Sequence, residues 1–167
     1  DDQSLIEFAD DSVEEIYTVF YSLVHGAEFD VDWNAELVDE QGKSWFPVID
    51  ESVQTLEDLK AYWEQSGLFS SDFEMPNFEY FREFNGRLYS GNEGTGGDIS
   101  LEGMKITGIV WREGVYALVE GEETRRDLTG DGDSYYNKPI YMQFKYENGF
   151  WKCCGVRMAG WEYGNCG

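Results

Sequence analysis

The apolar positions of the chain recur with two different periods, helical in its first part and alternating in its second. Within residues 12–25 they fall every three or four residues, which is the spacing of one face of an α-helix. Ser12 and Glu15 form a capping box, and Gly26 is typical of the position after a helix. The sequence therefore predicts a helix over residues 12–25, with a stripe of Val13, Ile16, Tyr17, Phe20 and Val24.

A second helix is predicted from the N-cap residue Thr55 to about Ser66, with Gly67 at its end. Residues 68–75 predict one or two further helical turns before Pro76 interrupts them. The expected buried stripe of the second helix consists of Leu56, Leu59, Tyr62 and Trp63.

Alternating apolar positions appear first near residue 78 and dominate after residue 104. The Asn85-Gly86 and Asn148-Gly149 pairs indicate two-residue hairpin turns, because both central positions of such turns take a positive φ. Residues 122–137 are polar and predict a long loop. The expected strands cover residues 78–84, 87–89, 104–112, 115–121, 139–147 and 150–158.

Helices followed by an antiparallel meander of about five strands predict an α+β fold, in which the helices cover one face of a curved sheet. We expect residues 100–160 to form the sheet and the helix over 12–25 to lie across it. The length favours a single domain over residues 1–167, with loose termini at 1–9 and 159–167. Three aromatic residues are expected to be strongly buried: Trp111, Phe144 and Trp151.

The net charge of −22 is unevenly distributed along the chain. Residues 1–80 carry 21 Asp/Glu against 2 Lys/Arg, a net charge of −19, whereas the remaining residues carry 13 against 10, a net charge of −3. Such a field repels nucleic acid and anionic lipid, so we expect neither as a partner. It favours a protein partner with a basic surface, or serves only solubility. No apolar run approaches the roughly 20 residues that a membrane-spanning helix needs.

Residues 28–40 contain six acidic residues and no basic one, and they predict an extended arm or a short strand. We interpret this acidic arm as the chief recognition element, with Trp33 as its apolar anchor. The glycine-rich residues 90–98 predict an exposed loop that also contacts the partner. Alternatively, Trp33 closes the end of the sheet and the carboxylates only maintain solubility. The predicted binding residues are Glu28, Asp30, Asp32, Trp33, Glu36, Asp39, Glu40, Asn92 and Glu93.

All three cysteines, Cys153, Cys154 and Cys166, lie in the last fifteen residues. A disulfide from Cys166 to Cys154 or Cys153 would tie down the C-terminal tail and fit an extracytoplasmic location, while buried free thiols are an equal alternative. The chain begins DDQSLIEFADD, which is typical of a mature start from which a leader was removed.

Candidate catalytic and metal-binding residues are few. His25, the single histidine, lies at the end of the first predicted helix, where a structural role is usual. Asp127, Thr129, Asp131 and Gly132 match the start of a calcium-binding EF-hand loop, but Lys138 stands where that loop needs glutamate. We therefore expect no metal and no cofactor, and the absence of a nucleophile motif favours a binding protein over an enzyme.

The order of these parts resembles a known family. The resemblance is carried by a Thr-x-Glu-Asp-Leu-x-x-Tyr helix, a Phe-Ser-x-x-Phe segment, the hairpin FREFNGRLY and the closing strand ENGFWK. These segments, within about residues 10–158, are similar to small secreted proteins of Gram-positive bacteria related to inhibitors of DL-endopeptidases. In this chain they correspond to Thr55, Glu57, Asp58, Leu59, Tyr62, Phe69, Ser70, Phe73, and residues 81–89 and 147–152.

The resemblance implies an inhibitor of cell-wall autolysins of the papain-like NlpC type, located outside the cell or at its surface, and has no catalytic residues to transfer. More loosely, the chain resembles the cystatin-like, nuclear-transport-factor-like cone fold. Two alternatives remain at this stage: a cone-fold protein that binds or converts a small molecule in a pocket, and an accessory or sensory domain of a lipoprotein. We expect a monomer.

Overall fold

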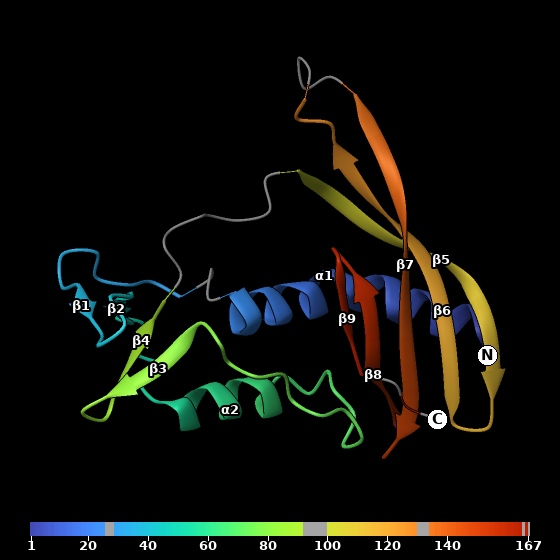
Figure 1. The fold of residues 1–167 in the computed structure, drawn as a ribbon. Coiled ribbons are helices and arrows are strands. Elements are labelled where there is room, and N and C mark those ends of the chain that lie inside the picture. Colours follow the sequence, from blue (N-terminus) through green and yellow to red (C-terminus); the bar gives the residue numbers. More distant parts are fainter. Residues whose placement is uncertain (26–28, 92–99, 130–133, 165, 167) are drawn as a thin grey trace. The chain divides into compact units, whose positions relative to one another are not determined.

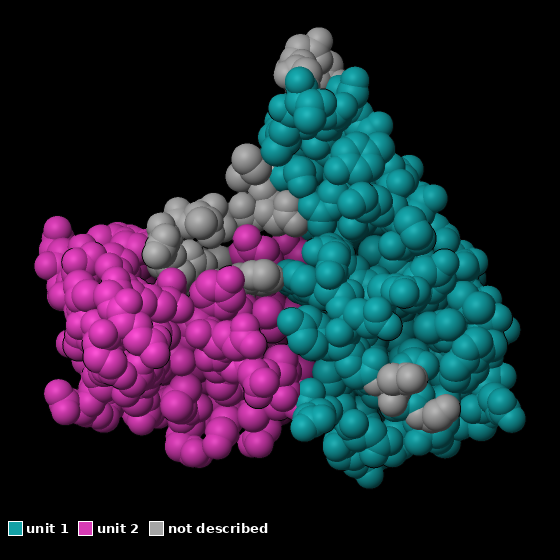
Figure 2. Space-filling model, in the orientation of Figure 1, with its two compact units in different colours: residues 1–16, 68–74, 98–167 teal, residues 17–67, 75–97 magenta. Residues whose placement is uncertain are grey.

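The computed structural model describes residues 1–25, 29–91, 100–129, 134–164 and 166. The fold is α+β, with two helices and two antiparallel sheets of five and four strands (Figure 1). The chain forms two compact units, shown in Figure 2 in teal and magenta. Unit 1 comprises residues 1–16, 68–74 and 98–167, and unit 2 comprises residues 17–67 and 75–97.

Helix α1 spans Asp2–His25 and begins about ten residues before the predicted start. The Asp1 carboxylate accepts the N–H of Ser4 at 2.8 Å and caps the helix, whereas the Ser12 hydroxyl donates to the Phe8 carbonyl at 2.7 Å inside it. Leu5 and Ala9 are completely buried. The prediction of a loose segment over residues 1–9 is therefore wrong, because the apolar stripe continues upstream between charged residues that merely cover the solvent face.

The five-stranded sheet of unit 1 has the order β5-β6-β7-β8-β9 with every pair antiparallel, which confirms the predicted meander. Strands β6 and β7 extend through half of the predicted loop at 122–137, since Arg126 still pairs with Tyr135. A ninth strand was missed; it follows a turn in which Ala159 and Gly160 have φ of 52° and 81°. The strands are β5 Leu101–Glu113, β6 Tyr116–Arg126, β7 Tyr135–Glu147, β8 Phe150–Met158 and β9 Trp161–Tyr163.

Residues 1–16 of α1 pack on one face of this sheet, which we call the inner face. The Phe8 and Phe144 rings meet edge to face at 5.9 Å, and Asp10 Oδ1 accepts the N–H of Ile106 at 2.8 Å. The prediction that a helix covers the sheet is confirmed for residues 2–16 of α1, which include residues 12–16 of the predicted helix. The second half of the helix belongs to unit 2, where Phe20 contacts Trp63 at 5.4 Å.

Only one of the three aromatic residues expected in the core is fully buried. Phe144 has no exposed surface, whereas Trp111 is 37% exposed and Trp151 is half-buried. Trp111 pairs with Leu118, and the next residue of β6, Ala117, pairs with Phe144, so Trp111 lies on the outer face. Register shifts in β5 move it there, because each extra residue in a strand reverses the face of those that follow.

Unit 2 contains a four-stranded sheet of order β1-β2-β4-β3 that the sequence did not reveal. Its strands are β1 Leu37–Val38, β2 Ser44–Pro47, β3 Phe81–Phe84 and β4 Arg87–Ser90. The hairpin between β3 and β4 is confirmed, with φ of 53° at Asn85 and 76° at Gly86, although β3 begins at residue 81 rather than 78.

Helix α2, Leu56–Gln65, is also confirmed, with Thr55 and Asp58 in a reciprocal capping box and Leu59 and Trp63 buried. The helical turns predicted for residues 68–75 are wrong. Phe69 instead forms a parallel bridge with Cys153 of β8, because the backbone groups of Cys153 bond to those of the residues on either side of Phe69. Within the described residues, no helix is long and apolar enough to cross a membrane.

We expect Phe144→Ala to reduce the free energy of unfolding by about 3–5 kcal/mol, because it leaves a cavity where the Phe8 and Phe144 rings meet. Urea denaturation followed by far-UV circular dichroism measures this loss. Trp111→Ala removes an aromatic ring of similar size from the outer face and should cost much less. Equal losses for the two variants would contradict the assignment of the inner face.

Candidate functional site

The described part of the acidic arm, residues 29–40, is fixed beside β2 in unit 2. Val31 forms an antiparallel bridge with Val48, and the Ile49 N–H donates to the Asp30 carbonyl at 2.8 Å. The Asp32 N–H donates to the Pro47 carbonyl at 3.0 Å. These bonds hold the arm in an extended conformation, so its side chains project from a defined backbone.

Trp33 is the most exposed tryptophan that the structure describes in unit 2, with 52% of its surface accessible. Its ring is tilted against that of Phe46 on β2, with 4.8 Å between the ring centroids. Asp32 Oδ1 accepts the N–H of Asn34 at 3.0 Å, which shapes the turn that carries the indole. The Trp33 ring therefore packs against Phe46 and stays open to solvent.

The carboxylates of the arm have different roles. Asp30 is exposed, and Glu36 is exposed and accepts the hydroxyl of Ser44 at 2.9 Å. Glu40, whose side chain is 75% exposed, lies 3.7 Å from the guanidinium of Arg82. These three carboxylates face solvent, and Arg82 supplies a counter-charge that the sequence pattern did not predict.

Asp39 does not belong to the exposed set, which corrects its assignment as a surface carboxylate. Its side chain is 2% exposed, accepts the Trp45 indole N–H at 2.9 Å and lies 3.6 Å from Arg82. The hydrogen bond from Trp45, the backbone N–H groups of Lys43 and Gln41 and the charge of Arg82 outweigh the effect of burial and lower the Asp39 pKa. This carboxylate organises the turn between β1 and β2.

Several predicted residues lie outside the part that the structure describes. These are Glu28, Asn92, Glu93, the end of the Asp127–Asp133 segment, and the His25 side chain. Their assignments stay predictions. Among the described residues, no group of three or more His, Cys, Asp or Glu side chains is placed to hold a metal ion.

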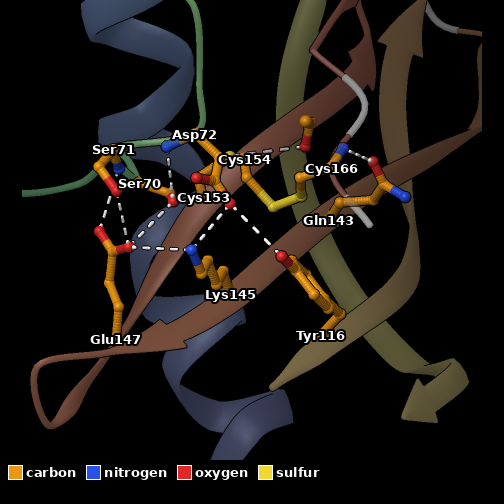
Figure 3. Close-up of a disulfide and its surroundings, with 11 residues drawn as sticks. Ser70, Ser71, Asp72, Tyr116, Gln143, Lys145, Glu147, Cys153, Cys154 and Cys166 are labelled. Carbon is orange, nitrogen blue, oxygen red and sulfur yellow. Dashed lines mark hydrogen bonds and ion pairs between the residues drawn. A yellow bond between two sulfur atoms is a disulfide. The ribbon is translucent and has the colours of Figure 1, made fainter. Parts of the chain in front are cut away.

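A polar cluster that the sequence did not single out joins residues 70–72 to the outer face of β7 in unit 1 (Figure 3). Glu147 accepts three hydrogen bonds, from the Ser71 N–H at 3.0 Å, the Ser71 hydroxyl at 3.1 Å and the Ser70 hydroxyl at 3.3 Å. Lys145 Nζ lies 2.8 Å from Asp72 and 3.7 Å from Glu147. Nothing in the local sequence indicates this cluster, because residues 70–72 are more than 70 positions away from Lys145 and Glu147.

The charges of the cluster stabilise each other and do not favour catalysis. Burial by itself raises the pKa of Glu147, but the bonds from Ser71 and Ser70 and the charge of Lys145 together bring the pKa below its ordinary value of 4.5. The hydrogen bond with Asp72 raises the pKa of Lys145 above 10.5. A lysine that stays protonated cannot take a proton from a nearby serine, so we interpret the cluster as structural.

Beside this cluster, a disulfide joins Cys154 on β8 to Cys166, with 5.8 Å between their Cα atoms (Figure 3). The Cys166 N–H also donates to Gln143 Oε1 at 3.2 Å, which holds the tail against β7. Cys153 is free and fully buried, and burial raises the pKa of its thiol to about 12. Its thiol is therefore protonated at neutral pH and is a poor nucleophile.

Shallow concavities of about 200 to 330 Å³ border the strands of the five-stranded sheet. Leu118, Tyr141 and Gln143 line one of them together with the C-terminal segment around Gly164. Comparison of the chain with models of known protein families finds no match, and neither does comparison with curated protein sequences.

We expect acidification to remove the stabilising effect of Glu147. Because its folded-state pKa is lowered, the carboxylate stabilises the fold above pH 4.5, and this contribution is lost as the pH falls through the folded-state value. Glu147→Gln should be less stable than the parent at pH 7, and the gap should narrow below pH 4.5. Unfolding curves of both proteins between pH 3 and 7 measure the gap. A gap that is independent of pH would contradict the charged network.

Reduction of the disulfide should lower the free energy of unfolding by about 2–3 kcal/mol, because Cys154 and Cys166 close a short loop in the unfolded chain. Denaturation with and without reductant measures the loss, and Cys166→Ser should reproduce it. Titration of unfolded, unreduced protein should find one thiol, that of Cys153. Three reactive thiols would show that the bridge does not form.

Proposed function

We propose that this chain is a non-enzymatic, extracytoplasmic binding protein that recognises a protein partner with a basic surface. The observation that carries the proposal is the exposed indole of Trp33, which packs against Phe46 and belongs to an arm that also carries the exposed carboxylates Asp30, Glu36 and Glu40. A large aromatic ring fixed in an exposed position and surrounded by charge is typical of the centre of a protein interface. The disulfide supports an oxidising compartment.

The resemblance to DL-endopeptidase inhibitors suggests the class of partner, a papain-like hydrolase of the bacterial cell wall. It also suggests the finer description of the fold as a cystatin-like cone. Supporting that description, residues 1–16 of α1 fill the inner face of the five-stranded sheet, where Leu5, Ala9 and Val13 are buried. A filled inner face favours a binding protein, since a pocket protein of this type needs that space for its ligand.

The alternative of a small-molecule pocket protein has less support. The concavities in the described part of unit 1 are open to solvent, and the one bordered by Tyr141 and Arg157 lies among exposed or half-buried residues. The third alternative, an accessory domain of a lipoprotein, depends on sequence beyond this chain, and no observation favours it here.

In a binding experiment with a cell-wall endopeptidase of the papain-like class, we expect the parent protein to form a complex and slow hydrolysis of wall peptide. Asp30→Asn combined with Asp32→Asn should slow association and flatten its dependence on salt, because exposed charges act mainly on the association rate. The asparagine side chain retains the hydrogen-bond acceptor that Asp32 offers to Asn34. Stopped-flow or surface-based kinetics at several salt concentrations measure both effects.

Trp33→Ala should mainly accelerate dissociation, by roughly tenfold or more if the indole is a hot spot, and leave the fold intact. Glu57→Gln combined with Glu64→Gln is the matched control, because it removes two exposed charges from α2 in unit 2, outside the arm. If the endopeptidase is not bound, the inhibitor hypothesis fails. If the arm variants and the control bind a captured basic partner equally well, the arm is a scaffold and the recognition hypothesis fails.

A further inference from the structure

One face of the four-stranded sheet in unit 2 carries a row of aromatic rings interleaved with cations. Tyr89 on β4 pairs with Pro47 on β2 and with Arg82 on β3, so these three residues share one face. Residues two positions apart in a strand lie on the same face, so Trp45 on β2 and Phe84 on β3 share it too. The Trp45 and Phe84 centroids are 5.8 Å apart, and those of Phe84 and Tyr89 are 5.2 Å apart. The three rings therefore form a continuous row, in which Trp45 is buried, with 5% of its surface exposed, and Phe84 and Tyr89 are half-buried.

At one end of the row, an ammonium group sits between two rings. Lys43 Nζ lies 4.5 Å from the centroid of Trp45 and 5.9 Å from that of Tyr80. A Cβ at Gly91 would come within 3.0 Å of both Lys43 Cε and a ring carbon of Trp45, so only glycine leaves this space open. We call the site formed by Trp45, Tyr80 and Gly91 the cation cage.

Two carboxylates strengthen the attraction of the cation cage for positive charge. Asp39, almost inaccessible to solvent, accepts the Trp45 indole N–H at 2.9 Å, and this charge-assisted bond polarises the ring toward greater electron density. Glu40, the next residue, remains exposed beside it. An indole whose N–H is bound to a buried carboxylate, with a second ring within 6 Å of the same ammonium, has the chemistry that recognises ammonium groups.

Lys43 is a replaceable occupant of this cage. Its backbone N–H is held by Asp39 Oδ1 at 3.0 Å, so the turn keeps its shape wherever the side chain points. The ammonium group itself is at the end of a flexible stem on an exposed residue. No ion pair within 4.0 Å is formed by Lys43 among the described residues, and its side chain interacts with the two rings.

We propose that the cation cage is a binding site for a lysine or arginine side chain of the partner, and that Lys43 occupies it in the free protein as an intramolecular competitor. The inference rests on the proposed function, since it names the chemical group by which a basic partner is recognised next to the acidic arm. Displacement of Lys43 leaves its ammonium in water, where hydration replaces the ring contacts. Binding therefore exchanges one cation for another without exposing the aromatic row.

Tetramethylammonium ion is the probe for the cage, because it carries the positive charge without hydrogen-bond donors. Lys43→Ala should bind it at least about fivefold more tightly than the parent, since the competitor is gone. The shift of the Trp45 indole N–H resonance, assigned by its absence in Trp45→Phe, measures binding at this site. Lys60→Ala, which removes an exposed lysine from α2 in the same unit, is the control and should match the parent.

Two outcomes would overturn the cage. One is a folded Lys43→Ala protein that binds tetramethylammonium no more tightly than the parent. The other is equally tight binding of the neutral isostere neopentyl alcohol, which would show an apolar cavity only. If Lys43→Ala loses the dispersed spectrum of the parent, Lys43→Gln takes its place, because it keeps part of the stem and a polar end without the positive charge.

The same variants separate this inference from the proposed function. Lys43→Ala should also strengthen binding of a lysine-containing protein partner, whereas the double Asp30 and Asp32 variant should weaken it. If tetramethylammonium binds to the cage but the arm variants leave partner binding unchanged, the cage stands and the proposed function fails. If the arm variants act but the cage does not respond to the probe, the function stands and this inference fails.

Discussion

A single apolar stripe on α1 supplies core residues to both units, and the rest of the structure depends on its burial. In unit 1, Leu5, Ala9 and Val13 are fully buried with the inner face of the five-stranded sheet, and Phe8 meets Phe144. In unit 2, Phe20 and Leu23 are fully buried, and Phe20 packs against α2 through Trp63. The inner face of the five-stranded sheet needs the first part of α1 to complete its core, and the second part of α1 packs with α2 in unit 2.

Folding changes the charge distribution that the linear sequence shows. Unit 2 contains 14 Asp/Glu and 4 Lys/Arg, a net charge of −10, and unit 1 contains 20 and 8, a net charge of −12. The difference in net charge between the two halves of the sequence therefore does not appear as a difference between the two units. The acidic residues 1–16 belong to the same unit as the strands that carry most of the basic residues. Acidity characterises both units, and any selectivity for a partner must come from local chemistry.

That local chemistry depends on how each polar group is satisfied. Two carboxylates have internal partners and hold backbone segments in place. Glu147 belongs to the cluster beside the disulfide, and Asp39 accepts the indole N–H of Trp45. Asp30, Glu36 and Glu40 remain in contact with water on the arm that carries Trp33, where we propose that they attract a basic partner over a distance. The proposed cation cage next to Asp39 would add short-range recognition of a cation. The two features act at different distances and would affect association and dissociation separately.

The sequence by itself determined the elements whose signals are local: the α2 cap at Thr55, the Asn85-Gly86 and Asn148-Gly149 turns, and the antiparallel meander of the second half. Periodicity and turn chemistry depend only on near neighbours. Only the tertiary structure decided that Trp111 faces outward, since bulges shift the register of β5, and that Glu147 binds residues 70–72. It also decided that the Asp39 side chain is inaccessible to solvent while Asp30 is exposed, because Asp39 contacts Trp45 on β2 and Arg82 on β3.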